Sequence, residues 1–169
     1  METGYGHVLV AGGTGMLSGM TKWLAKRSKS LTLVARHPQR LAAELGCIPH
    51  PLDWTAPNAI DNLPKKKFDL LISWLHRDGL WLALPFENLL FPGGRSIRIH
   101  GSASMEIDAR AKVDPIPRKD IQRTIVVLGW IEDGTTRRWL TNREISDGVI
   151  NAIETPLQET VIIGTPRAT

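Results

Sequence analysis

Short apolar runs alternate along this sequence with segments in which apolar residues recur every three or four positions. The runs have the length of buried β-strands, and the spaced segments have the period of α-helices that cover one face of a sheet. Short links between them favour parallel strands joined by right-handed crossovers. Strands are predicted from Val8 up to the first glycines and over residues 31–35, 47–50, 68–74, 96–100, 121–131 and 159–164.

Helices are expected between most of these strands. Gly46 should end the second helix, and Pro85 should kink the fourth or end it early. Thr141 and Glu144 have the spacing of a capping box at the start of the last helix. Residues 105–120 contain two prolines and are expected to form a partial helix and then an irregular loop. The predicted helices span residues 16–27, 38–45, 56–63, 79–90 and 141–154.

This order of elements predicts an α/β fold, a doubly wound parallel sheet of about seven strands in a Rossmann-type three-layer sandwich. A chain of 169 residues is long enough for one well-packed core, so residues 1–169 are expected to form a single domain. Apolar residues make up 42% and charged residues 22% of the chain, which is ordinary for a globular protein.

The turn after the first strand is rich in glycine and is predicted to bind an anion. Backbone N–H groups at the start of a helix have no internal partner, and the helix dipole places partial positive charge there. Glycines let the chain turn sharply and let a pyrophosphate approach the backbone. Such a turn also occurs without a ligand, but the preceding strand and the following helix favour binding. The predicted contacts are Gly12, Gly13, Thr14, Gly15, Met16 and Leu17.

The motif AGGTGMLS, a basic residue at the end of the second strand and LDW at residues 52–54 together resemble the short-chain dehydrogenase/reductase superfamily in its atypical branch. The resemblance covers about residues 7–104. Ser18 stands where the third glycine of the usual dinucleotide motif would be, with Gly19 one position later. The resemblance implies a nicotinamide dinucleotide cofactor and places Asp53 at the position that binds the adenine amino group, with Trp54 beside it. An acidic residue at a helix start is the alternative interpretation of Asp53.

The end of the second strand predicts which dinucleotide is bound. An acidic residue there selects NAD, whereas arginine pairs with the 2′-phosphate of NADP. Arg36 stands at this position and Arg40 follows one helical turn later, so the sequence favours NADP, although surface arginines are common at such junctions. Because ligands bind beyond the carboxyl ends of parallel strands, Ser73 and Trp74 at the end of the fourth strand are also expected to contact the cofactor.

The catalytic groups are harder to predict. Tyrosine-dependent members of the superfamily place Tyr-x-x-x-Lys after the fifth strand, but the single tyrosine here is Tyr5, which precedes the first strand. Hydroxyl and imidazole groups remain near the predicted crevice. Ser102 lies at about the position of the superfamily's catalytic serine, and His76 has the side chain best suited to proton exchange near neutral pH. A structural histidine is the alternative.

Two functions follow. The first is a small NADPH-dependent oxidoreductase that transfers hydride to an imine, flavin, quinone or carbonyl substrate. The second is a non-catalytic NADP-binding redox sensor or regulator of the NmrA-like kind. Those regulators generally carry a C-terminal extension for a partner, which favours the enzyme. No metal site is expected, because histidine pairs at metal-binding spacing do not occur.

Charge and hydropathy restrict the partners. The net charge is +4, but basic and aromatic residues do not interleave, so a nucleic-acid partner is not expected. No apolar run is long enough to span a bilayer, and the N-terminus lacks the pattern of a secretory signal, so a cytoplasmic location is expected. The apolar segment 80–90 has more apolar surface than one sheet face can bury, which predicts a homodimer or homotetramer.

Overall fold

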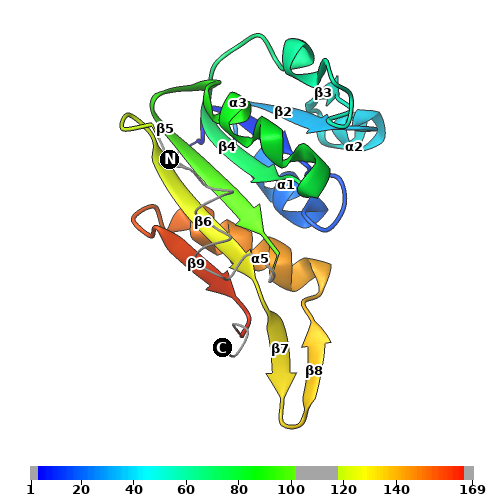
Figure 1. The fold of residues 1–169 in the computed structure, drawn as a ribbon, viewed down its shortest axis with the longest axis vertical. Helices are drawn as coiled ribbons and strands as arrows, with labels where there is room; N and C mark the ends of the chain where they lie inside the picture. The colour runs from blue at the N-terminus through cyan, green and yellow to red at the C-terminus, as the bar shows by residue number, and fades with distance from the viewer. Residues whose placement is uncertain (1–3, 102–117, 166–169) are drawn as a thin grey trace.

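The computed structural model describes residues 4–101 and 118–165 and contains a seven-stranded parallel sheet (Figure 1). The strand order is β3-β2-β1-β4-β5-β6-β9, and every neighbouring pair runs parallel. This order, with the reversal between β1 and β4, is that of a doubly wound fold and confirms the predicted fold class. The strands are β1 (His7–Ala11), β2 (Ser30–Ala35), β3 (Ile48–Pro51), β4 (Phe68–Trp74), β5 (Leu90–His100), β6 (Gln122–Leu128) and β9 (Thr160–Ile163).

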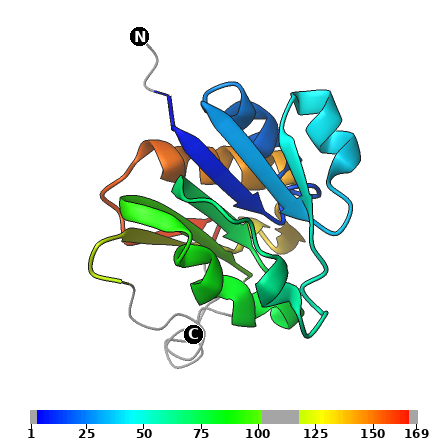
Figure 2. The ribbon, with the colours of Figure 1, turned by 90° about the horizontal axis from the view of Figure 1, so that it is seen from above.

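Helices cover both faces of the sheet (Figure 2). One face is covered by α1 (Ser18–Ala25), α2 (Gln39–Leu45) and α5 (Asn142–Glu154), and the other by the 3-10 turns η1 (Ala59–Asn62) and η2 (Arg77–Leu82) and by α3 (Ala83–Glu87). Each face has its own core, because successive residues of a buried strand point to opposite sides. Thus Val8 and Val10 pack under α1 and α5, whereas Leu9 packs under α3.

Two local sequence signals correctly predicted where a helix begins or ends. The capping box is present at α5, where the Thr141 hydroxyl accepts a hydrogen bond from the Glu144 N–H at 3.2 Å and the Glu144 carboxylate accepts one from the Thr141 N–H at 2.8 Å. Helix α2 ends at Gly46, which adopts the left-handed conformation (φ +68°). These signals succeeded because each acts through a local hydrogen bond or a backbone angle.

Two predicted helices are shorter than expected. The segment 56–63 forms only the 3-10 turn η1, and the segment 79–90 divides into η2 and the five-residue helix α3. Prolines account for both outcomes. Pro57 and Pro64 leave little room for a regular helix between them, and Pro85 cannot donate the backbone hydrogen bond that a helix interior requires.

Two strands also differ from the prediction. Strand β5 begins at Leu90 rather than at residue 96, because the Gly93-Gly94 segment forms an irregularity within the strand and not a turn before it; the pairing with β4 shifts register between Phe68 and Leu70. The predicted strand 121–131 ends at Leu128. The expected elements of residues 105–117 lie outside the described residues.

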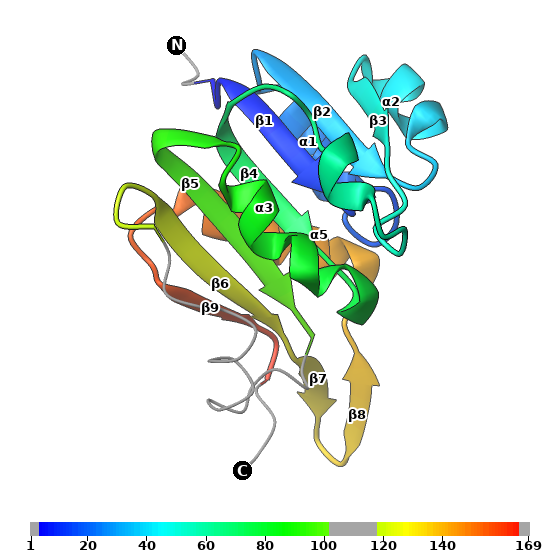
Figure 3. The same ribbon diagram turned by 45° about the horizontal axis from the view of Figure 1, so that its top comes forward.

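After Gly129 the chain forms an antiparallel hairpin that projects from the body of the molecule (Figure 3). Its strands are β7 (Trp130–Asp133) and β8 (Thr136–Trp139), joined by a turn in which Gly134 has φ +60°. The residues Trp130 and Trp139 face each other across the hairpin, with ring centroids 5.5 Å apart. The hairpin was not predicted from the sequence.

A buried ionic group fixes α3 to the sheet. The Glu87 side chain, 2% exposed, accepts a hydrogen bond from the Ser96 hydroxyl at 2.8 Å and pairs with Arg98 of β5 at 3.0 Å and with Arg123 of β6. Removing one partner from such a group would leave an uncompensated buried charge. None of the helices in the described part of the chain has the length and apolar character needed to cross a membrane.

Candidate functional site

The first two glycines of the turn after β1 are required by close packing. Gly12 has φ +83°, and a Cβ atom there would lie 2.2 Å from the Trp74 carbonyl oxygen. A Cβ atom at Gly13 would lie 2.4 Å from Val10 Cγ1 and 2.5 Å from the Thr21 hydroxyl, which itself donates a hydrogen bond to the Gly13 carbonyl. These two glycines therefore let β1, β4 and α1 approach one another.

Gly15 has a different environment, because a Cβ atom there would meet nothing within 4 Å. It precedes α1, whose first residue, Ser18, donates its N–H to the Gly15 carbonyl. Within residues 4–101 and 118–165, no backbone acceptor binds the N–H groups of Thr14, Gly15 or Met16. Open space, N–H groups without a backbone acceptor and the positive end of a helix are the features that suit a turn to an anion.

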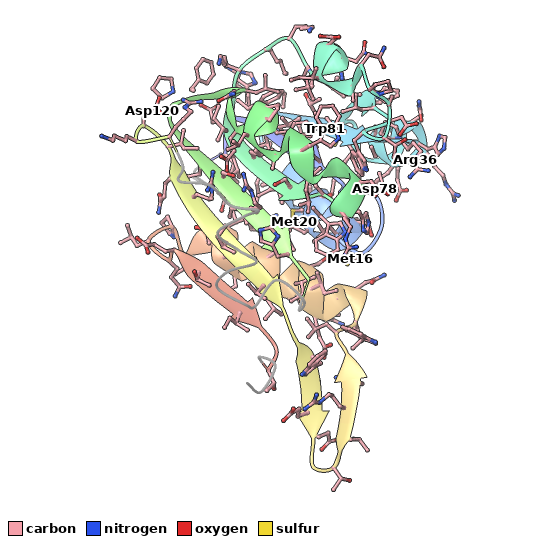
Figure 4. The ribbon with its side chains drawn as sticks, viewed as in Figure 1. Met16, Met20, Arg36, Asp78, Trp81 and Asp120 are labelled. Atoms are coloured by element: carbon pink, nitrogen blue, oxygen red, sulfur yellow. The ribbon has the colours of Figure 1, made fainter. Side chains whose placement is uncertain are left out.

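A cleft of about 420 Å³ lies at this turn, at the carboxyl ends of β1, β2 and β4. Arg36 comes from the end of β2, and Met16 comes from the segment before α1 (Figure 4). The Met16 carbonyl accepts a hydrogen bond from the Ser146 hydroxyl of α5. We name this cavity the cofactor cleft, after the ligand that the sequence analysis predicts for it. The lining residues are Gly12, Thr14, Gly15, Met16, Ala35, Arg36, Trp54, Trp74 and His76.

A second groove, of about 510 Å³, lies between α1 and α2 and shares Thr14 with the cofactor cleft. Arg40 lines this groove and not the cleft, together with Lys22, His37 and Glu44. The two arginines predicted to bind one phosphate therefore lie in adjoining cavities. The groove carries two cationic side chains against one carboxylate, so an anion at the Thr14 end is favoured there.

Asp53 does not line the cofactor cleft and is exposed. Its carboxylate accepts hydrogen bonds from the Thr55 hydroxyl at 2.6 Å and the Thr55 N–H at 3.0 Å. These hydrogen bonds, with a smaller contribution from the Arg36 guanidinium, hold the pKa of the Asp53 carboxyl below its ordinary value. Asp53 stays ionised at neutral pH and forms a local turn at the mouth of the site.

Three other predicted contacts are buried and do not line the cleft. Gly13 packs against Val10, and the Leu17 side chain is in the core beneath α1, so these residues can offer a ligand only their backbone. Ser73 is buried at the end of β4, beside Ala11 of β1 and Arg98 of β5. Ser102 lies outside the described residues.

The candidate proton donor His76 and the single tyrosine, Tyr5, lie at opposite ends of the sheet. His76 is exposed at the cofactor cleft, where its ring meets the Trp74 ring edge-on with centroids 5.4 Å apart. Tyr5 packs against Trp23 near the end of α1, with ring centroids 5.7 Å apart. Burial, and secondarily the charge of Glu154, raises the pKa of the Tyr5 phenol, so it is not an activated acid or base.

An apolar pocket of about 280 Å³ adjoins the cofactor cleft and was missed by the sequence analysis. Met16 and Trp74 line both cavities, so the two meet there. We name it the hairpin pocket, because Trp139 of β8 forms part of its wall. The Asp-Gly turn at residues 133–134 was the sequence signal that could have revealed it. Its lining residues are Met16, Trp74, Gly101, Leu128, Gly129, Trp139, Leu140, Asn142 and Ile145.

A metal centre is not formed by the described residues: within them, no group of three or more His, Cys, Asp or Glu side chains could hold a metal ion.

No protein-family model matches the sequence. No curated protein matches it either. Solved structures do resemble it. BdcA in complex with NADPH has a TM-score of 0.67 and 13% identity, with 100% of this chain and 98% of that chain covered. A putative β-ketoacyl-ACP reductase has a TM-score of 0.72 and 14% identity, with 98% of each chain covered.

A third similar structure is an enoyl-(acyl-carrier-protein) reductase from Anaplasma phagocytophilum in complex with NAD, with a TM-score of 0.64 and 12% identity over 97% of this chain and 92% of that one. At such low identity the likeness concerns the fold alone. This protein therefore has the Rossmann-type fold that these three structures share.

Proposed function

We propose that this protein is an NADP-dependent oxidoreductase that reduces a small molecule without a catalytic tyrosine. The observation that carries the proposal is the joint presence, in one cleft, of the open Gly15 turn and the Arg36 side chain. The first suits a pyrophosphate and the second suits the 2′-phosphate that distinguishes NADP from NAD. The similar structures include one in complex with NADPH and one in complex with NAD, which supports a nicotinamide dinucleotide.

The residues of the cleft divide the work of binding. The free N–H groups of Thr14, Gly15 and Met16 hydrogen-bond the pyrophosphate, and Trp54 offers an apolar surface to the adenine. Arg36 pairs with the 2′-phosphate, and Arg40 adds positive charge from the adjoining groove. Asp53, held ionised by Thr55, lies near Arg36 and hydrogen-bonds the adenine amino group.

Trp74 and Met16 mark the nicotinamide end of the cleft, where the hairpin pocket begins. Bound NADPH supplies a hydride there. The substrate takes its proton from water or from His76, whose imidazole is exposed at the same cleft and is the side chain that most often serves as a general acid. Ser102 is proposed to orient the substrate. Tyr5 takes no part, because it packs against Trp23 beside the end of α1.

An assay of NADPH oxidation with imines, flavins, quinones and ketones tests the proposal. The reaction is monitored through the loss of the absorbance of the reduced nicotinamide. Turnover with at least one class is expected, and Tyr5→Phe should leave it unchanged. His76→Ala should slow substrates that need a proton during hydride transfer, by roughly 10²-fold or more, and should spare those that do not. Tight NADPH binding without turnover of any of these substrate classes would contradict the reductase function and favour the non-catalytic sensor. Ketone reduction abolished by Tyr5→Phe would contradict the mechanism.

A further inference from the structure

Trp139 is exposed to an unusual degree for a tryptophan. Its side chain is 70% exposed, although the residue lines the hairpin pocket and its ring contacts Trp130 across the hairpin. Burying a large aromatic surface stabilises a complex strongly, and exposed aromatics beside a cavity are typical of binding surfaces. A flat ligand in the pocket would bury the Trp139 ring. The exposure of Trp139 thus points to a ligand with an aromatic or conjugated face.

The chemistry of the hairpin pocket restricts that ligand further. Among the described residues that line it, none is ionisable, and Asn142 contributes the single polar side chain. A cationic or anionic group would lose its hydration there without gaining a partner, which is costly. The volume of about 280 Å³ is just below the range of about 300 to 1,000 Å³ typical of sites for drug-sized ligands. The described part of the lining therefore suits an uncharged molecule of one or two fused rings.

The position of the pocket next to the cofactor cleft suits this ligand to accept a hydride from the cofactor. Met16 and Trp74 line both the pocket and the cofactor cleft, so a molecule in the pocket lies next to the nicotinamide end of the cleft. Helix α5 supports the wall between them, because Ser146 donates a hydrogen bond to the Met16 carbonyl at 3.2 Å and the α5 residue Ile145 lines the pocket.

We propose that the substrate is an uncharged planar quinone and that Trp139 is the specificity-determining residue that covers it. This inference rests on the NADP-dependent reductase function proposed above. The quinone accepts a hydride, which carries two electrons and one proton, from NADPH, which leaves as NADP⁺. The resulting hydroquinone anion takes a second proton from solvent and dissociates as the hydroquinone. The charge of this short-lived anion is delocalised from its phenolate oxygen into the ring and is removed by the second proton, so the step needs neither a cationic partner nor a proton-donating side chain in the pocket.

The other acceptor classes fit the pocket less well. An imine is cationic when it is activated for hydride transfer, and the described lining offers no carboxylate to pair with it. A flavin nucleotide carries phosphate, and the described lining offers no cation. A simple ketone needs a proton as hydride arrives, whereas His76 lies at the cofactor cleft and does not line the hairpin pocket.

Binding can be tested without turnover. The chain has six tryptophans, so incorporation of fluorotryptophan gives a fluorine NMR resonance for each, and single Trp→Phe variants assign them. Titration of the NADP⁺-bound protein with menadione, an uncharged naphthoquinone, should shift the resonances of Trp139 and Trp74. The resonance of Trp23, which packs against Tyr5 beside the end of α1, should not move. A naphthoquinone sulfonate and a cyclic iminium should shift Trp139 only at concentrations roughly tenfold higher or more.

Kinetics give the second readout. Trp139→Ala should raise the KM for menadione about tenfold, with the dissociation constant of NADPH unchanged, and Trp139→Phe should recover most of the loss because it restores an aromatic face. Phe91→Ala is the matched control, since Phe91 is also an exposed aromatic side chain but lies at the opposite end of β5.

The outcomes separate the two proposals. Absence of NADPH binding would overturn the proposed function, whatever menadione does. Normal NADPH binding with an unmoved Trp139 resonance at saturating menadione would overturn the quinone site alone. Equal binding of menadione and its sulfonate would also overturn it, because an apolar pocket must discriminate against charge.

Discussion

The cofactor cleft and the hairpin pocket meet at Met16 and Trp74 but are built from different parts of the chain. The cleft is formed largely by the glycine turn and by residues at the ends of neighbouring strands, all within the first half of the sequence. The pocket is formed by apolar side chains from β6, β8 and α5 together with the two shared residues. Under the two proposals, backbone geometry supports recognition of a phosphate-containing cofactor, whereas the apolar shape of the described pocket lining selects the second ligand.

The largest effect should come from alanine substitutions that compare a closely packed glycine of the turn, Gly12, with the open one, Gly15. Gly12→Ala places a methyl group against the Trp74 carbonyl at a positive φ, so it should lower the free energy of unfolding by about 3 kcal/mol. Gly15→Ala meets no neighbouring atom and should change stability by less than about 0.5 kcal/mol, while weakening NADPH binding roughly tenfold.

Urea denaturation and NADPH titration of both variants check this prediction. A Gly15→Ala protein that binds NADPH normally would show that the turn does not approach the cofactor. Recognition of the cofactor by backbone geometry in the cleft would then be disproved.

The next effect concerns the charge that marks the cofactor cleft. Arg36→Ala should weaken NADPH binding by about 1.5 to 3 kcal/mol, the range of a hydrogen bond to a charged group, and should leave NADH binding nearly unchanged. Arg143→Ala removes an exposed arginine from α5 and serves as the control for net charge. Isothermal titration with both nucleotides measures the difference. Equal losses for NADPH and NADH would assign Arg36 a structural role.

A third prediction concerns the exposed apolar surface of η2 and α3. Trp81 is 47% and Leu84 41% exposed, whereas Phe86 of the same segment is fully buried, so we expect this apolar surface to form a homodimer or homotetramer contact. Leu84→Glu should weaken association by about 2 kcal/mol or more. Leu157→Glu, at another exposed leucine, is the control. Light scattering that finds a wild-type monomer at micromolar concentration would disprove the prediction.

The smallest effect should appear at the start of α5, which forms one end of the hairpin pocket. Hydrogen bonds from Arg138 and from the Thr141 N–H lower the pKa of Glu144 from 4.5 to about 2. A lowered pKa means that ionised Glu144 stabilises the fold above pH 4.5 and that this contribution is lost as the pH falls towards about 2.

Glu144→Gln should therefore be less stable than the wild type at neutral pH, and the difference should vanish in strong acid. Urea unfolding at both pH values measures it, with Asp147→Asn on the same helix as the control for one lost negative charge. A stability difference that persists undiminished at low pH would show that the capping geometry, and not the charge, is responsible.

The first half of the chain could be predicted well because its signals are local. The Val8 run, the glycines and Arg36 specify a strand, a turn and a strand end within 29 residues, and the structure brings most of the predicted contacts into one cleft. Leu17 and Ser73 did not reach the cleft, because their side chains are buried in the body of the fold. Sequence position identified the right segment but could not tell which way each side chain points.

The second half depended on contacts between distant residues. Position 129, directly after β6, requires glycine because a Cβ atom there would lie 2.2 Å from the Thr165 carbonyl oxygen, a contact that no local pattern reveals. The hairpin then carries Trp139 back towards Met16, more than a hundred residues earlier in the chain. The hairpin pocket could therefore not be predicted from the sequence, although the Asp-Gly pair at residues 133–134 is a signal for the hairpin itself.

Affinity for the two reduced nucleotides tests the central claim most directly. The dissociation constants of NADPH and NADH should be measured for the wild-type protein by the same titration at the same ionic strength. We expect NADPH to bind roughly tenfold more tightly or better, because Arg36 pairs with the 2′-phosphate. Equal affinities, or no binding of either nucleotide, would contradict the assignment of an NADP-dependent oxidoreductase.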